Sequence, residues 1–249
     1  PLEKKISIVI ERGIGIDAIS RKLHRAGVLE RPIILRVAAR LFNNYKNLKA
    51  GEYEFTLGIS PEEILNLLQS GKTVVRRVTL AEGLSTVEIL LLLQNTEGLQ
   101  GTVSPFPGEG TLLPETYHFS FGDNRQDIVW RMAIAMRKLV ASLWRQRMPN
   151  LPFLTPDEAV VLASIVEKET ALPSERSRVA AVFVNRIRKG MRLQSDPTVV
   201  YGLTKGAGPL GRKLTRSDLK FLTSYNTYII RGLPPGPISS PGSASLQAV

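Results

Sequence analysis

The order of short strand and helix patterns in the first 72 residues constrains the fold of this chain more than any other feature. Strands are indicated by short runs of β-branched and aromatic residues, and helices by apolar residues that recur every three or four positions. In order, these patterns predict a strand at 6–10, helices at 16–27 and 32–41, a strand at 53–56 and a helix at 60–70. Mixed elements of this kind predict an α+β fold.

The rest of the 249-residue chain contains further helix boundaries and one long irregular region. Thr155-Pro156-Asp157-Glu158, like Ser60-Pro61-Glu62-Glu63, places a capping residue, a proline and a glutamate where a helix begins. The patterns predict a strand at 74–80, helices at 85–94, 128–146 and 155–171, and a helix that Ser174 caps and Gly190 ends. Residues 191–249 are rich in Gly, Pro, Ser and Thr and carry one helix signal at 215–219, which predicts a structured functional loop region.

Composition excludes several kinds of chemistry. The chain has no cysteine, so disulfides, thiolate nucleophiles and Cys-based metal sites are impossible. His24 and His118 are the two histidines, and neither lies beside a G-x-S-x-G elbow, which disfavours a Ser-His-Asp triad and a multi-histidine metal centre. Metal centres that use cysteine or several histidines are therefore disfavoured. Apolar runs such as Ile89–Leu93 are much shorter than the ~20 residues that span a bilayer.

The net charge of +11 indicates an anionic partner. Nucleic-acid binding is disfavoured, because aromatic residues make up only 6% of the chain and no nucleic-acid-binding motif is present. An anionic polymer or an acidic membrane surface fits the charge equally well.

Two glutamates at the end of the 155–171 helix are the first candidate site. Glu169 follows Leu162, Ile165 and Val166 at helical spacing, so it is expected to continue an apolar stripe, whereas Glu167 lies about 160° away. A carboxyl group on an apolar stripe is expected to be buried and to have the raised pKa of a general acid. The alternative is a structural glutamate at the helix end that pairs with a basic residue, for which Arg176 and Arg178 are candidates.

Two further clusters combine polar and aromatic groups. The segment 194–201 carries an Asp-Pro step, which predicts a turn crowded with polar side chains, and an ordinary Asx-turn is the alternative. The segment 225–228 is Tyr-Asn-Thr-Tyr and precedes the proline-rich stretch 232–242. Aromatic faces with nearby amides and hydroxyls suit sugar rings, although the proline-rich stretch could simply be a rigid connector. The candidate binding residues are Gln194, Ser195, Asp196, Thr198, Tyr201, Tyr225, Asn226, Thr227 and Tyr228.

Together these segments resemble a known family. The resemblance rests on Glu-Lys-Glu-Thr at 167–170, on 190–199 (Gly-Met-Arg-Leu-Gln-Ser-Asp-Pro-Thr-Val), on Tyr-Asn-Thr-Tyr at 225–228 and on Gly-Leu-Pro-Pro-Gly-Pro-Ile at 232–238. Upstream, Gly51–Phe55 and Glu109–Tyr117 match as well. In these motifs the chain resembles the endolytic murein transglycosylases of bacteria.

The resemblance implies an enzyme that cuts peptidoglycan glycan strands between N-acetylmuramic acid and N-acetylglucosamine. It implies that 1,6-anhydro-muramoyl ends are left, which terminates strand elongation, and that no cofactor is used. Glu169 would be the catalytic acid and base, and Glu167 would join the substrate-binding residues. Peptidoglycan synthases (penicillin-binding proteins) are implied partners. Family members sit in the bacterial inner membrane with a periplasmic catalytic part, anchored by an N-terminal helix that this sequence does not contain.

The resemblance also assigns a role to each part of the chain. Residues 1–72 would form a LysM-like peptidoglycan-binding module, 73–110 a small α/β linker unit and 111–249 the catalytic domain, with the Glu169 helix at its centre. Two other functions stay open: a non-catalytic peptidoglycan-binding scaffold, and a pyridoxal-phosphate-dependent aminodeoxychorismate lyase. The sequence lacks the Gly-rich phosphate loop expected of the lyase.

Overall fold

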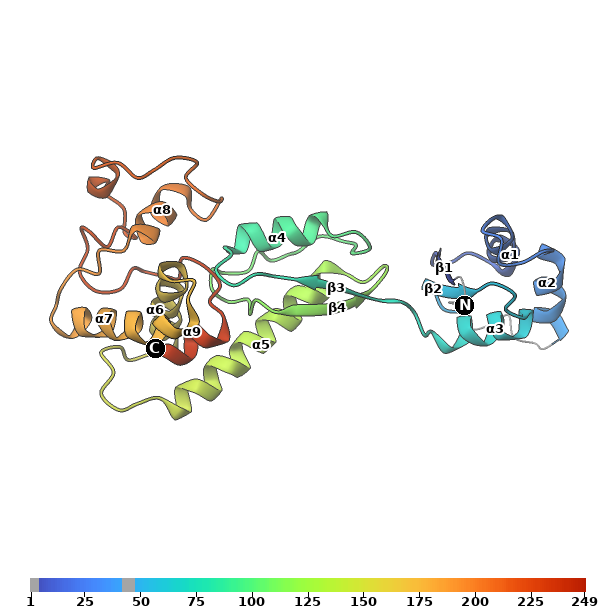
Figure 1. Cartoon of the computed structure of the whole chain (residues 1–249), viewed down its shortest axis with the longest axis horizontal. Coiled ribbons are helices and arrows are strands. Elements are labelled where there is room, and N and C mark those ends of the chain that lie inside the picture. Colours follow the sequence, from blue (N-terminus) through green and yellow to red (C-terminus); the bar gives the residue numbers. More distant parts are fainter. Residues whose placement is uncertain (1–4, 42–47) are drawn as a thin grey trace. The chain divides into compact units, whose positions relative to one another are not determined.

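The structure, a computed structural model, describes residues 5–41 and 48–249 and is α+β (Figure 1). Within the described residues the chain forms two compact units. The first takes in the chain up to Arg77 together with Glu97–Gln100 and His118–Asp123. The second comprises Val78–Thr96, Gly101–Tyr117 and Asn124–Val249. The functional boundaries expected at 72 and 110 stay predictions.

The first unit has the strand-helix-helix-strand order that the sequence predicts. Its elements are β1 (Lys5–Ile10), α1 (Ile16–Arg25), α2 (Pro32–Leu41), β2 (Gly51–Thr56) and α3 (Pro61–Ser70). Strands β1 and β2 pair antiparallel, from Lys5↔Thr56 to Ile10↔Gly51. The alternate side chains of β2, Tyr53 and Phe55, are fully buried against the apolar faces of the helices. The predicted capping box at Ser60 and Glu63 is present.

A buried ion pair fastens the segment that follows α3 to β2. Arg76 donates from Nε to Glu52 Oε2 at 2.6 Å, and Ser7 Oγ donates to Oε1 at 2.6 Å. The Glu52 side chain is only 10% exposed. The hydrogen bond from Arg76, supported by Ser7, outweighs the effect of burial and lowers the pKa of Glu52. The carboxylate therefore stabilises the fold in its ionised form.

The second unit is mostly helical. Its helices are α4 (Thr86–Asn95), α5 (Arg125–Gln146), α6 (Pro156–Glu169), α7 (Arg176–Arg188), α8 (Asp196–Thr204) and α9 (Ser243–Ala248), with 3₁₀ turns η1 (Pro173–Glu175) and η2 (Asp218–Lys220). Strands β3 (Val75–Thr79) and β4 (Thr116–Ser120) pair with each other, and the division between the units falls within both.

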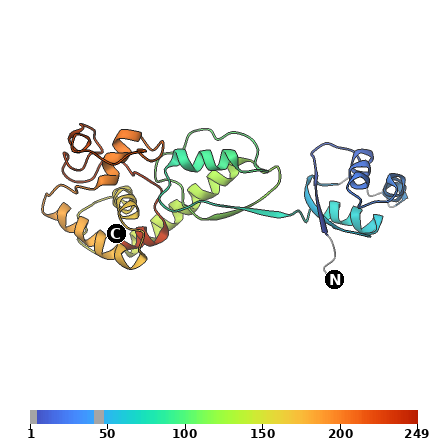
Figure 2. The same cartoon turned by 45° about the horizontal axis from the view of Figure 1, so that its top comes forward.

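Helix α6 is the centre of the second unit. It contacts α5, α7, α8 and α9, and the turned view of Figure 2 shows the same helix among them. Every residue from Val160 to Val166 is buried, so α6 has no polar face over this stretch. A helix that is apolar all round must lie inside the protein. Only its first and last turns can therefore carry solvent-accessible groups.

Three sequence predictions about helix boundaries were wrong. Ser174 does not cap α7 but lies inside η1, because Pro173 starts a 3₁₀ turn one residue earlier. The Asp196-Pro197 step starts helix α8 instead of an isolated turn, because a proline is well tolerated in a first helical turn. Residues 191–249 consequently contain α8, η2 and α9, whereas the sequence indicated one helix in this region. Among the described residues, no helix combines the length and apolarity needed to cross a bilayer.

We expect replacement of Arg76 by Gln to lower the stability of the first unit by about 2 kcal/mol at pH 7, because a buried carboxylate loses its cation. The stabilisation from ionised Glu52 is present above the pKa of an unfolded glutamate, about 4.3. It is lost as the pH falls through the lowered pKa of the folded state, so the difference from the parent should shrink below about pH 4. Amide hydrogen exchange over residues 5–41 and 48–77 measures this difference in stability. The exposed Arg77→Gln is the control, and a pH-independent loss would contradict the assignment.

Candidate functional site

The two glutamates at the C-terminal end of α6 differ in burial, and Glu169 is not the buried one. Glu169, the last residue of the helix, is exposed, whereas the Glu167 side chain is only 5% exposed. The expectation that an apolar stripe buries Glu169 was wrong, because α6 is buried all round and its wheel has no unique apolar side. Burial at its C-terminal end depends instead on which neighbouring loops cover each side chain.

Glu167 is enclosed by two segments far away in the sequence. Arg176 Nη2 donates to Glu167 Oε1 at 3.2 Å and to Glu82 Oε2 at 3.0 Å, and the backbone N–H of Gly242 donates to Glu167 Oε2 at 2.9 Å. A Cβ on Gly242 would lie 1.8 Å from a Glu82 oxygen, so a larger residue there would displace the Glu82 side chain. Burial and the nearby charge of Glu167 raise the pKa of Glu82, against the opposing effect of Arg176.

Glu169 meets the second predicted cluster directly. Ser195 Oγ donates to Glu169 Oε2 at 3.0 Å. Ser195 is the N-cap residue of α8, yet its hydroxyl makes no capping bond to that helix. Gln194, just before it, is exposed and has a left-handed φ of +52°, which is uncommon for a residue other than glycine. Backbone strain of this kind concentrates at functional sites.

Besides Ser195, three of the predicted binding residues lie in the protein interior. Thr198, Asn226 and Thr227 are 0% exposed. Thr227 Oγ1 lies 2.8 Å from Thr198 Oγ1 and accepts from the Ser195 N–H at 3.0 Å. The Asn226 side-chain amide donates to the carbonyls of Leu219 and Phe221. Because these groups are already hydrogen-bonded to one another and to the backbone, they hold the two segments together and present no free surface to a ligand.

Asp196 and Tyr228 remain at the surface of the same cluster. Tyr228 OH donates to Asp196 Oδ1 at 2.6 Å, and this hydrogen bond is the main cause that raises the pKa of Tyr228 to about 12. The negative charge of Glu169 contributes to the same shift, so the tyrosine lies within electrostatic range of that carboxylate. The structure thus brings Glu169, Ser195, Asp196 and Tyr228 together.

Tyr201 and Tyr225 form a second group with a carboxyl group that local sequence patterns did not single out. Their rings lie 4.8 Å apart, and Tyr201 OH donates to Glu109 Oε2 at 3.3 Å. Glu109 Oε1 accepts from the backbone N–H of Thr86 at 2.9 Å, at the first turn of α4. Burial is the main cause of the raised pKa values of Glu109, Tyr201 and Tyr225. Because Glu109 is 92 residues from Tyr201, no local periodicity could have found this contact.

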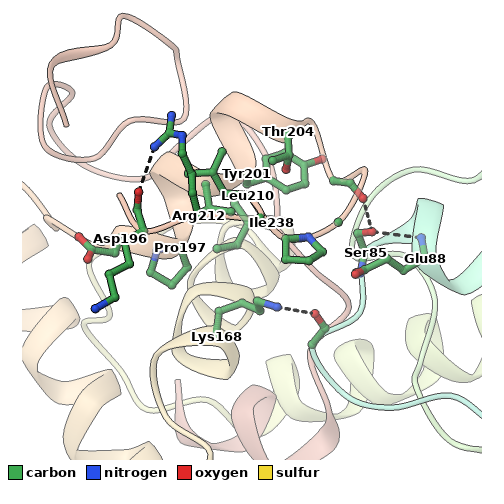
Figure 3. Close-up of a pocket in the computed structure, with 17 residues that line it drawn as sticks. Ser85, Glu88, Lys168, Asp196, Pro197, Tyr201, Thr204, Leu210, Arg212 and Ile238 are labelled. Atoms are coloured by element: carbon green, nitrogen blue, oxygen red, sulfur yellow. Dashed lines mark hydrogen bonds between the residues drawn. The ribbon is translucent and has the colours of Figure 1, made fainter. Parts of the chain in front are cut away.

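A cavity of about 830 Å³ lies beside these groups (Figure 3). Lys168 lines it next to Glu169, and Asp196 and Pro197 line it directly after Ser195. Tyr201 forms part of its wall. Glu109, the hydrogen-bond partner of Tyr201, lines a second cavity of about 770 Å³ between α5, α6 and Pro235–Pro237. A cleft of this size, with convergent polar groups at its edge, suits an extended ligand.

The fold and site define an α+β protein of two units, with an exposed carboxylate and a polar cleft at the end of a buried helix. The chain belongs to the YceG-like family, whose profile matches residues 8–249. A YceG-like protein from Listeria monocytogenes, known from a 2.6 Å crystal structure, is 30% identical with a TM-score of 0.55. The match covers 99% of this chain and 89% of that one.

Curated relatives carry the name endolytic murein transglycosylase. The protein from Streptococcus pneumoniae strain R6 is 27% identical over 293 residues, and the alignment covers 99% of this chain and 52% of the relative. The protein from Bacillus subtilis strain 168 is 25% identical, with 100% of this chain and 77% of the relative covered. The chain therefore spans about half the length of the pneumococcal relatives that it matches.

We expect Arg176→Met to destabilise the second unit by about 3–5 kcal/mol, because the enclosed Glu167 carboxylate loses its cation. Urea unfolding followed by tryptophan fluorescence measures this, since Trp130 and Trp144 both belong to the second unit. The exposed Arg178→Met is the control. Adding Glu167→Gln to Arg176→Met should recover part of the loss, and strict additivity of the two changes would contradict the coupling.

Ionisation of Glu109 is expected to lower the stability of the folded protein, which is opposite in sign to the effect of ionised Glu52. The pKa of Glu109 is raised by burial, so the ionised form is unfavourable in the folded state at high pH. The parent should gain stability as the pH falls through that raised pKa toward the value of an unfolded glutamate. Glu109→Gln should therefore be at least as stable as the parent at pH 8, with an advantage that vanishes near pH 4. Glu109→Ala should be less stable, because Thr86 N–H loses its acceptor. A Gln variant more than about 1 kcal/mol less stable at pH 8 would contradict this account.

Proposed function

We propose that this chain is the catalytic region of an endolytic peptidoglycan transglycosylase and that Glu169 is its catalytic residue. It would cleave the bond between N-acetylmuramic acid and N-acetylglucosamine and leave 1,6-anhydro-muramoyl ends, which terminates glycan elongation. The observation that carries the proposal is the 3.0 Å hydrogen bond between Ser195 and Glu169, which joins two separate motifs of the resemblance at one carboxylate. Family membership over 8–249 and the names of the relatives support the choice of substrate.

The proposed reaction needs one carboxyl group with two successive tasks. Protonated Glu169 donates its proton to the glycosidic oxygen as the bond from that oxygen to C1 of the muramoyl residue breaks. The resulting carboxylate then takes the proton from the C6 hydroxyl of the same residue, whose oxygen forms the new bond to C1. Glu169 ends protonated again, and no water is consumed. A hydrolytic glycosidase would instead use two carboxylates at a set separation.

The surroundings of Glu169 favour this role over that of Glu167. Glu169 is exposed and can reach a polymeric substrate, whereas both Glu167 oxygens are already hydrogen-bonded inside the protein. Ser195 donates a hydrogen bond that orients the Glu169 carboxylate. A glycan laid over this surface would exclude water from the carboxyl group, which favours the protonated acid. Glu167 in this proposal positions the end of α6 and does not touch the substrate.

The proposed binding groups flank Glu169 on two sides. Gln194, Asp196 and Tyr228 are accessible next to it, and Tyr201 and Tyr225 offer partly buried aromatic faces near the cleft. Aromatic faces with hydroxyls at their edges suit the apolar faces and polar rims of sugar rings. Thr198, Asn226 and Thr227 would act by holding these residues in place.

The proposal extends to the rest of the chain. The β1-α1-α2-β2 order with antiparallel pairing supports a LysM-like peptidoglycan-binding role for the first unit. The family resemblance supports a place at the bacterial inner membrane, with this region in the periplasm, and peptidoglycan synthases as partners. A net charge of +11 suits a polymer whose peptides carry carboxylates.

Glu169→Gln should lower the rate of anhydro-end release about 10²- to 10⁴-fold, because the amide has no transferable proton. Its stability should match the parent, since the side chain is exposed. Glu167→Gln is the matched comparison within the same helix turn and should lower stability more than it lowers the rate. Mass spectrometry of the ends released from isolated sacculi measures the rate. If Glu167→Gln were inactive and Glu169→Gln active, the two roles would be reversed. Binding to sacculi without anhydro ends from the parent would favour the scaffold function.

A further inference from the structure

We propose that the 830 Å³ cavity beside Glu169 is a subsite for a carboxylate-bearing peptide attached to the glycan strand, held by Lys168 and Lys213. The inference rests on the proposed function and names the part of the substrate that this cavity would recognise. It follows from which charges in the cavity are already neutralised by the protein and which are not.

Lys168 brings a positive charge into the cavity that no carboxylate neutralises. Its Nζ donates to the carbonyl of Gly83 at 3.2 Å, a neutral partner (Figure 3). The two glutamates that flank it in the sequence have other partners, since Glu167 is bound by Arg176 and Glu169 by Ser195. Lys168 makes no ion pair with any carboxylate in the part of the chain that the structure describes.

The loop 209–213 supplies two more cations to the cavity. Arg212 is already paired with Asp218, with Nη1 and Nη2 at 2.6 and 2.9 Å from its two carboxylate oxygens. That pair joins the loop to η2, and Asp218 also accepts from the N–H and hydroxyl of Thr215. Lys213, the next residue along, lines the cavity without an ion pair within 5–41 and 48–249. Lys168 and Lys213 are therefore the cations left for a ligand.

Two carboxylates also line the cavity, and no ion pair neutralises either of them within the described residues. The Glu88 carboxylate accepts from the Ser85 N–H at 2.8 Å in the capping box of α4, and Asp196 accepts from Tyr228 at 2.6 Å. A neutral donor leaves the charge of each carboxylate in place, as the Gly83 carbonyl leaves that of Lys168. The lining therefore offers cations and anions together, which favours a ligand that has carboxylates for the two lysines and hydrogen-bond donors for Glu88 and Asp196.

The apolar part of the lining indicates a peptide instead of more sugar. Pro197, Val200, Leu210 and Ile238 line the cavity between the charged groups. A glycan strand carries no charge on its sugar rings once the lactyl group is joined to a peptide by an amide bond. The carboxylates and methyl groups of peptidoglycan lie on its peptides, and both kinds of group have matching partners here. Because Lys168 is next to Glu169, a peptide bound here would belong to a sugar at or near the cleaved bond.

The test compares glycan strands with and without peptides. Removal of the peptides by an amidase leaves a lactyl carboxylate on the sugar, so strands with amidated peptides are needed to separate the two kinds of carboxylate. The three substrates are strands with intact peptides, the same strands after an amidase has removed the peptides, and strands whose peptide carboxylates have been amidated. The readout is the ratio of kcat/KM for anhydro-end release between peptide-bearing and peptide-free strands. The variants are Lys168→Gln with Lys213→Gln, and the control is Lys138→Gln, an exposed lysine of α5 that lines neither cavity described above.

The parent and the control should prefer peptide-bearing strands, and the double variant should lose about tenfold of that preference, as two charge-assisted contacts disappear. Amidation of the peptides should reproduce the loss in the parent, and higher salt should weaken the preference. A general effect of the lysines on folding or on Glu169 would change all substrates alike and leave the ratio constant. A constant ratio overturns the inference.

Direct binding separates this inference from the proposed function. Isothermal titration with the free acidic peptide, and with its amidated form, measures recognition without any cleavage. Peptide binding that the double variant loses, with no anhydro ends from any substrate, would support the subsite and refute the transglycosylase proposal. Cleavage with no peptide preference and no peptide binding would refute the subsite alone.

Discussion

The enclosed Glu167 carboxylate is the constraint on which the arrangement around the end of α6 depends. A buried carboxylate is tolerated only where cations and N–H donors satisfy it, and here Arg176 of α7 and the N–H of Gly242 do so. Arg176 also binds Glu82, so the chain before α4 and the proline-rich loop before α9 both converge on the Glu167–Arg176 pair. The final turn of α6, with Lys168 and Glu169, is thereby fixed relative to the segments that surround it.

A network of hydroxyl groups fixes the start of α8, just as the Glu167–Arg176 ion pair fixes the end of α6. Thr227 accepts from the Ser195 N–H and contacts Thr198, and all three residues are fully buried. The Thr198 N–H donates to the Ser195 carbonyl at 3.2 Å, and the Ser195 hydroxyl binds Glu169 instead of capping its own helix. Neutral hydroxyls suit this task, because a charged group at the same place would need its own buried counter-ion.

Sequence patterns predicted the elements of this protein better than the details of its site. Capping boxes at Ser60 and Thr155 placed two helix starts correctly, because a cap depends on residues only three positions apart. The burial expected of Glu169 was wrong, because burial at the end of α6 depends on covering segments such as the one at Gly242, which local periodicity does not reveal. The alternative, a helix-end glutamate paired with Arg176, is present at Glu167. Glu109 shows the same limit, since its partner Tyr201 is brought to it by the tertiary fold. The contact between Glu169 and Ser195 likewise depends on the tertiary fold, because 26 residues separate them in the sequence.

The exposure of Glu169 also bears on how one carboxyl group could serve a polymer-cleaving reaction. An acid buried in the free protein would have a ready-made apolar environment, but a glycan strand could not reach it without a large opening. At the exposed end of a rigid, buried helix the carboxyl group is accessible, and the substrate itself would supply the dry environment that favours proton transfer. Catalytic strength would then depend on how completely the strand covers Glu169. Residues that fix the strand at a distance, including those of the adjacent cavity, would contribute to the rate as well as to affinity.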